Sequence, residues 1–168
     1  MAEQNEPATG DEGVIKIMVC VDGSKHAETA FKFYVQHFHK PENKVIFMHV
    51  AKLVMHSHVY TGAMGVVLPE VPTKDEVEKE KKRAKELKEK FRKLCEELGV
   101  PKHEFVTIME GEGGLGATIV AAAKRRSVSS IICGCRGLGT IRRTILGSVS
   151  DYVLHHSHIP TLICPKET

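Results

Sequence analysis

Short apolar runs alternate with amphipathic stretches along most of this chain. The apolar runs are rich in valine and isoleucine and are bounded by polar residues, glycine or proline, which is typical of strands buried on both faces of a sheet. We expect five such strands, at residues 14–21, 44–50, 104–109, 130–133 and 160–164. Between them, apolar side chains recur at three- and four-residue spacing, which predicts helices at residues 24–38, 73–98, 117–126 and 148–156. This alternation indicates an α/β fold whose parallel sheet is covered by helices on both faces.

Local signals mark where the helices begin and end. Ser24 is placed to cap the first helix, and Thr73 with Glu76 forms the pattern of a capping box at the start of the second. Gly99 is a typical residue for the end of that second helix. The segment 51–72 has no periodicity, so we expect an irregular stretch there, either a functional loop or a disordered one.

The order of the strands decides where a ligand would bind. Right-handed crossovers leave few topologies for five parallel strands, and we expect the order 3-2-1-4-5. In such sheets ligands bind beyond the carboxyl ends of the strands, at the point where the strand order reverses. That point lies between the first and fourth strands, so Asp22 would face the loop 134–137 across a crevice.

A glycine-rich loop follows the fourth strand and has the chemistry of an anion site. Glycines stand at 134, 137 and 139, and Gly147-Ser148 opens the last helix. Glycine lets backbone N–H groups approach an anion, and a helix N-terminus offers unpaired donors. Residues 113–150 contain no acid, and their basic residues are Lys124, Arg125, Arg126, Arg136, Arg142 and Arg143. We interpret the stretch as a phosphate site in a positive field; the alternative is a glycine turn beside a solvated basic helix face.

The spacing of these glycines resembles a known pattern. Gly134-x-x-Gly137, nine residues and then Gly147-Ser148 is similar to the ATP-binding pattern of the universal stress protein family. The segments 19–24 and 147–163 resemble the first strand and turn and the last helix and strand of that family. The resemblance covers residues 14–165. It implies an adenine nucleotide α-hydrolase-like, Rossmann-like fold, with one domain at 14–168 after a flexible tail at 1–13.

The resemblance also implies a set of ligand-binding residues. Asp22 and Val21 would contact the adenosine part, and Val50 would line the adenine pocket. The ribose and phosphates would lie along Gly134, Arg136 and Gly137. Cys133, which directly precedes Gly134, belongs to the same set. The phosphates would be held by backbone N–H and hydroxyl groups of Gly147, Ser148, Val149 and Ser150. The implied ligand is ATP, ADP or AMP, and whether Mg²⁺ accompanies it is left open.

The function implied by the resemblance is that of an ATP-binding regulatory module in stress resistance. Family members form homodimers, and the apolar edge strand 160–164 is the surface we expect to pair. The alternative is a slow ATP hydrolase or a nucleotidyl-transferring enzyme that uses the same crevice. Such an enzyme needs a base and usually a metal ligand near the γ-phosphate, and the acid-free loop offers neither. We therefore assign no catalytic residue and no metal ligand.

Composition argues against several other classes of function. A net charge of +3 and an aromatic content of 5% do not favour a nucleic-acid partner. No apolar run approaches the length of a membrane span, and the polar first residues do not resemble a secretory signal, so we expect a cytoplasmic protein. The five cysteines are expected to be reduced core thiols.

Two motifs suggest other ligands but are incomplete. Gly111-x-Gly113-x-x-Gly116 resembles a dinucleotide fingerprint, yet no acid follows about twenty residues later to bind a ribose. Cys133-Gly-Cys135 has no second cysteine pair to complete a zinc site, and no acid or cysteine cluster accompanies the histidine pairs.

Overall fold

A five-stranded parallel sheet forms the centre of the molecule. The computed structural model describes residues 13–53, 57–59, 67–69, 72–135 and 146–165. The strands are β1 (Lys16–Cys20), β2 (Lys44–Ala51), β5 (His103–Met109), β6 (Ser130–Gly134) and β7 (Thr161–Cys164). Their order is β5-β2-β1-β6-β7, and all four neighbouring pairs are parallel. The predicted strand order is therefore confirmed.

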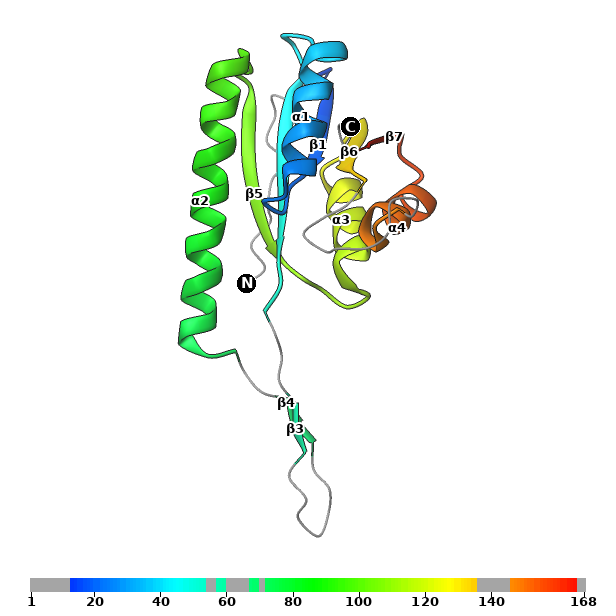
Figure 1. Cartoon of the computed structure of the whole chain (residues 1–168). Helices are drawn as coiled ribbons and strands as arrows, with labels where there is room; N and C mark the ends of the chain where they lie inside the picture. The colour runs from blue at the N-terminus through cyan, green and yellow to red at the C-terminus, as the bar shows by residue number, and fades with distance from the viewer. Residues whose placement is uncertain (1–12, 54–56, 60–66, 70–71, 136–145, 166–168) are drawn as a thin grey trace, which may run out of the picture.

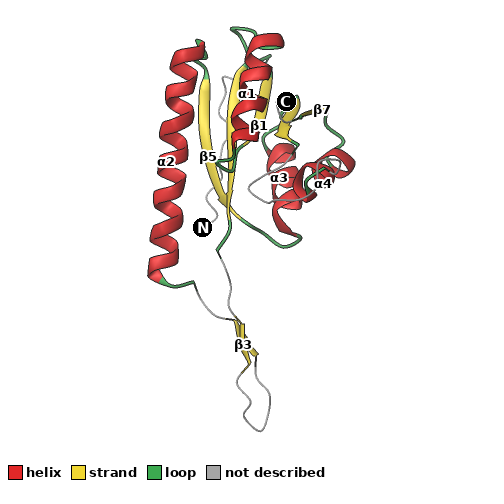
Figure 2. Cartoon of the chain, viewed as in Figure 1, coloured by secondary structure: helices red, strands yellow, loops and turns green. Residues whose placement is uncertain are grey.

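Four helices cover the sheet, as predicted. They are α1 (Lys25–His37), α2 (Lys74–Leu98), α3 (Gly114–Arg125) and α4 (Ser148–His156). The long helix α2 runs beside α1 on one face of the sheet, and α3 and α4 lie on the other (Figures 1 and 2). Side chains of β2 alternate between these two layers because successive residues of a strand point to opposite faces. Val45 and Phe47 pack under α1 and α2, whereas Ile46 and Met48 pack under α3 and α4.

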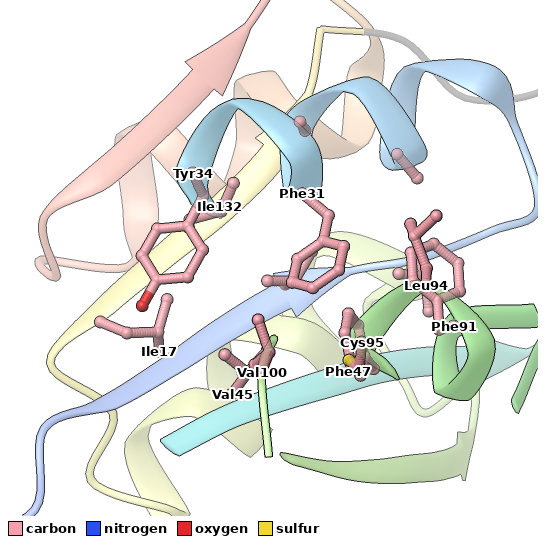
Figure 3. Close-up of a cluster of buried hydrophobic side chains, with 14 of the residues drawn as sticks. Ile17, Phe31, Tyr34, Val45, Phe47, Phe91, Leu94, Cys95, Val100 and Ile132 are labelled. Atoms are coloured by element: carbon pink, nitrogen blue, oxygen red, sulfur yellow. The ribbon is translucent and has the colours of Figure 1, made fainter. Parts of the chain in front are cut away.

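Aromatic rings fill the layer between the sheet and α1 and α2. Phe31 of α1, Phe47 of β2 and Phe91 of α2 are each almost fully buried (Figure 3). Their ring centroids lie 4.9 Å apart for Phe31 and Phe47 and 4.9 Å apart for Phe47 and Phe91. Burying a side chain of this size contributes roughly 1.5–3 kcal/mol. This cluster fixes α2 on the sheet along its second half.

The helix ends follow the sequence signals closely. The Ser24 hydroxyl accepts a hydrogen bond from the N–H of Ala27 (3.3 Å). At the start of α2 the capping box is complete, because Thr73 Oγ1 accepts from the N–H of Glu76 and the Glu76 carboxylate accepts from the N–H of Thr73. Gly99 ends α2 with φ of 70°, a left-handed conformation that favours glycine.

Two expectations about local structure were wrong. The segment 51–72 is not wholly irregular, because β3 (Ser57–Val59) and β4 (Val67–Pro69) form an antiparallel hairpin. Three-residue strands are too short to leave a periodic signal in the sequence. The hairpin extends away from the sheet beyond the end of β2 (Figure 1). Helix α3 begins at Gly114 rather than at Ala117.

The early start of α3 gives its glycines a structural role. Gly113 precedes the helix with φ of 88°. A Cβ atom on Gly116 would lie 2.7 Å from Cβ of Tyr152 in α4, so the absence of a side chain allows the two helices to pack closely. These residues of the incomplete dinucleotide motif are thus explained by helix geometry and packing.

The capping box gives a direct test of how α2 is stabilised. We expect Thr73→Ala to lower the free energy of unfolding by about 1 kcal/mol, because the N–H of Glu76 loses its partner. Thr73→Ser keeps a hydroxyl at the cap and should stay within a few tenths of the wild-type value. Urea denaturation of both variants measures the difference, and equal stabilities would contradict a working cap.

Candidate functional site

The carboxyl ends of β1 and β6 lie side by side at the point where the strand order reverses. Val19 of β1 is in register with Ile132 of β6, so the residues that follow both strands emerge at the same edge of the sheet. The chain after β1 carries Val21 and Asp22, and the chain after β6 carries Cys135. This is the position at which parallel α/β sheets bind ligands.

The turn after β1 presents the carboxylate of Asp22. One of its oxygens, Oδ1, accepts a hydrogen bond from the N–H of Ser24 (2.9 Å), which shapes the turn into α1. Gly23 has φ of 87°, a conformation that glycine adopts without strain. Asp22 is half-buried. Its carboxylate is therefore held in place on one side, and as an acceptor it suits a hydroxyl or amino group of a ligand.

At the end of β6, Gly134 is in close contact with α1. A Cβ atom there would lie 2.8 Å from Cβ of His26 and 2.9 Å from its backbone carbonyl atoms. The glycine is thus required for packing, whatever it also does for a ligand.

Two thiols lie beneath the crevice. Cys20 ends β1, and its thiol is hydrogen-bonded to that of Cys133 in β6; this contact and burial raise the pKa of Cys20 well above its ordinary value. Burial also raises the pKa of Cys164 to about 11. All five cysteines are free. With raised pKa values, Cys20 and Cys164 stay protonated near neutral pH. Since Cys133 is buried, a ligand in the crevice would meet its backbone.

The first turn of α4 lies at the same edge of the sheet. The N–H of Gly147 donates to the carbonyl of Cys135 (2.8 Å), and the buried Ser150 hydroxyl donates to the carbonyls of Cys135 (3.2 Å) and Gly147 (2.9 Å). These donors are engaged within the protein. The exposed Ser148 hydroxyl and the backbone N–H groups of the first turn remain as the groups that suit an anion.

The structure places the remaining predicted residues as follows. Val50 is half-buried at the end of β2, against the α3 and α4 layer, as an apolar wall residue would be. Arg136 and Gly137 lie outside the described residues, and so do Arg142 and Arg143.

Three of the basic residues assigned to the phosphate field are at the wrong end of the sheet. Lys124 and Arg125 end α3, and Arg126 follows them, so they precede β6 and lie near the amino ends of the strands. Arg126 forms an ion pair with Glu104 at the start of β5 (2.9 Å). The sequence places these cations close to the loop along the chain, but the helix carries them to the opposite end of the sheet.

Sequence reasoning missed a polar group behind the Asp22 turn. His49 of β2 is almost fully buried, and its Nδ1 and Nε2 lie 3.1 Å from the carbonyl oxygen of Val21 and 2.9 Å from Oε1 of Glu80 in α2. Arg83, one turn further along α2, donates from Nη2 to the carbonyl oxygen of Asp22 (2.9 Å). The sequence contained a signal that Glu80 faces the sheet. It lies seven residues before Leu87, which places both on the helix face that packs on the sheet.

A hollow of about 540 Å³ lies next to this group. It is lined by the following residues of the chain after β2 and of α2: Lys52, Leu53, Glu76, Lys79, Glu80, Lys82, Arg83 and Glu86. The lining contains both cations and carboxylates, so its charge favours neither an anionic nor a cationic ligand. Within the described part of the chain, no group of three histidine, cysteine or acidic side chains could hold a metal ion. None of the described helices is long and apolar enough to span a membrane.

Comparisons with curated proteins show relatives of moderate identity. Universal stress protein PHOS32 of Arabidopsis thaliana is 27% identical over 163 residues, which cover 88% of this chain and 63% of that protein. A second Arabidopsis relative, universal stress protein PHOS34, is 26% identical and is covered over 60% of its length. The chain thus spans about three fifths of the length of these two relatives.

Solved structures share the fold. Universal stress protein UspA from Lactobacillus plantarum superposes with a TM-score of 0.68 at 20% identity, over 89% of this chain and 96% of that one. A universal stress protein family protein from Arabidopsis thaliana, solved with AMP bound, gives 0.63 at 20% identity over 92% and 93%. A universal stress protein in complex with cAMP gives 0.62 at 18% identity over 89% and 96%.

The family assignment rests on the match to a family model. The model of the universal stress protein family matches residues 14–165, which include every strand and helix described above. Together with the strand order, this match shows that the chain belongs to the universal stress protein family.

Proposed function

We propose that this protein binds an adenine nucleotide in the crevice between β1 and β6 and acts as a nucleotide-dependent module of the stress response. The observation that carries the proposal is the pairing of two complementary groups at one edge of the sheet. The Asp22 carboxylate is an acceptor suited to the nucleoside, and the first turn of α4 offers donors suited to phosphates. AMP and cAMP bound to structural neighbours support an adenine nucleotide as the ligand.

In this proposal each part of the nucleotide has its own residues. The adenine lies against Val50, and Asp22 accepts from the nucleoside, with Val21 beside it. The phosphates lie at the first turn of α4, where the Ser148 hydroxyl and the N–H groups of Val149 and Ser150 donate to them. Gly134, Arg136 and Gly137 follow the ribose and phosphates on the loop side. With ATP as ligand, Mg²⁺ would be held mainly by phosphate oxygens and water.

Binding rather than catalysis is the role that the described residues support. Phosphoryl transfer needs a group that positions the nucleophile near the γ-phosphate. Asp22 is assigned to the nucleoside end, and one of its carboxylate oxygens is already engaged with Ser24. We propose that nucleotide occupancy shifts the population of states that a partner protein recognises, in a cytoplasmic setting.

Replacing Asp22 tests the nucleoside end. In Asp22→Asn the amide oxygen can still accept from the N–H of Ser24, so the turn is preserved, but a ligand donor loses a charged acceptor. We expect affinity for AMP and ATP to fall about tenfold, measured by calorimetry. Glu97→Gln removes the same charge from the exposed end of α2 and should bind like wild type. Unchanged affinity in Asp22→Asn would reject this role for Asp22, and absence of binding by wild type would reject the proposed function.

The two serines of α4 should behave differently. Ser148 is exposed, and we expect Ser148→Ala to weaken nucleotide binding several-fold while leaving the free energy of unfolding unchanged. Ser150 donates to two backbone carbonyls, so Ser150→Ala should lower the free energy of unfolding by about 1 kcal/mol. Calorimetry and urea denaturation of both variants separate these effects. Equal stability of the two variants would contradict a structural role for Ser150.

We also propose that the protein forms a homodimer through β7, which is an edge strand of the sheet. The carbonyls of Pro160 and Cys164 accept from β6, so the alternate residue Ile163 directs its N–H away from the sheet. An edge of this kind offers a row of donors and acceptors to a second copy.

Removing one outward donor tests the dimer. We expect light scattering of the wild type at micromolar concentration to give twice the monomer mass. Ile163→Pro lacks the outward N–H and should give the monomer mass, because proline is tolerated on an edge strand but cannot donate to a partner. Ile163→Ala keeps the N–H and controls for the lost side chain. A monomeric wild type would contradict the proposal.

A further inference from the structure

The polar group behind the Asp22 turn forms a closed ring of contacts. His49 joins the carbonyl of Val21 to Glu80, and Arg83 joins Glu80 to the carbonyl of Asp22. The Arg83–Glu80 contact is the longest, at 3.9 Å between Nη1 and Oε2. The side chains of His49 and Arg83 thus contact two consecutive carbonyls of the chain that leaves β1.

The hydrogen-bond geometry determines how many protons His49 carries. A backbone carbonyl can only accept, so Nδ1 must donate to Val21. The Glu80 carboxylate also accepts, so Nε2 must donate as well. A neutral imidazole has only one N–H and cannot satisfy both partners. Arg83 pairs with the second carboxylate oxygen of Glu80, so the ring that satisfies both contacts is the imidazolium.

The burial of this ring makes the loss of its proton costly. The side chain of His49 is 3% exposed, and that of Glu80 is 15% exposed, so water cannot readily replace a lost contact. A neutral ring would turn a lone pair either toward the Val21 carbonyl or toward the Glu80 carboxylate. Either arrangement sets two acceptors against each other in a region of low dielectric constant.

Among the residues that the structure describes, few other charges lie near the ring. The charged groups near it are Glu80 and Arg83 from α2 and Asp22 from the turn after β1. Its neighbour on β5 is Thr107, which is uncharged. Glu76, Lys79 and Lys52 line the hollow beyond Glu80 and are further members of the same electrostatic environment.

We propose that His49 is a positioning residue for the nucleotide site, which with Glu80 and Arg83 holds the Val21–Asp22 turn in its binding geometry only while its ring is doubly protonated. The proposal rests on the proposed function of that turn and adds a regulation to it. Nucleotide affinity is then full at low pH and falls as the pH rises and the ring loses a proton. The change in affinity comes from the position of the turn that carries Asp22.

A single substitution should remove the proton dependence while keeping the contacts. In Glu80→Gln the amide N–H can donate to Nε2, and Nδ1 still donates to Val21, so a neutral ring satisfies both partners. We expect wild-type affinity for AMP to fall about tenfold between about pH 6 and pH 9, as one hydrogen bond of a charged group is lost. Glu80→Gln should change less than twofold. The matched control Glu86→Gln removes the same charge from an exposed position of α2 and should keep the wild-type slope.

The readout is the difference in slope between variants, measured by calorimetry. The phosphate of AMP titrates in the same range, but this contribution is common to all three proteins and cancels in the difference. Equal slopes for wild type and Glu80→Gln would overturn the proposal. A flat profile for Glu86→Gln would overturn it too, because the effect would then be one of net charge.

Two further measurements do not depend on nucleotide binding. Nitrogen chemical shifts of the His49 ring in the wild type should show a doubly protonated ring at pH 6, and a neutral tautomer there would overturn the proposal even if Glu80→Gln does not fold. In the absence of nucleotide, the free energy of unfolding of the wild type should fall relative to that of Glu80→Gln as the pH rises. If AMP does not bind at any pH but both results hold, the proposed function fails while the proton-dependent contact stands. If AMP binds and both results fail, the proposed function stands and the proton-dependent contact is rejected.

Discussion

The structure depends on the central strand β1, which is bonded to β2 on one side and β6 on the other and is buried on both faces. Its residues alternate between the two hydrophobic layers, with Val19 facing α1 and α2 and Met18 facing α3 and α4. Because β1 is hydrogen-bonded on both sides and packed on both faces, the turn that follows it has a defined position at the edge of the sheet. The connections from β1 to β2 and from β6 to β7 leave this edge in opposite directions, which is the arrangement at which parallel α/β sheets bind ligands.

The polar turn after β1 is supported by hydrogen bonds from the face of the sheet that α2 covers. His49 continues the row of Val45 and Phe47 on the face covered by α2, so a strand that is otherwise apolar ends in a hydrogen-bonding group. Burying a polar pair such as His49 and Glu80 costs free energy that their attraction only partly offsets. We therefore explain this pair by its role in positioning the backbone of Val21 and Asp22, and not by a gain in stability.

Much of the fold could be predicted from the sequence because its signals are local. The apolar runs, the cap at Thr73 and the glycine at the end of α2 all act within a few residues, and the strand order follows from the handedness of crossovers. The site was harder to predict, because its residues are distant in the sequence and come into contact only in the folded protein. The basic residues at the end of α3 lie near the amino ends of the strands, although the glycine loop follows them closely in the chain, whereas His49 and Glu80 are distant in the chain and in contact. The hairpin of β3 and β4 was missed because its strands are too short to show a period.

The carbonyl of Cys135 accepts hydrogen bonds from both Gly147 and Ser150. These bonds join the end of β6 to the start of α4, on either side of the segment that connects them. Helix α4 is in turn seated against α3 at Gly116. Both ends of the connecting segment are therefore anchored by residues that lie outside it. Its length and composition are free to diverge during evolution without displacing the helix end, since the entropy of closing a longer loop rises only slowly. Such an arrangement would allow substitutions and insertions in this segment while the architecture on either side of it is conserved.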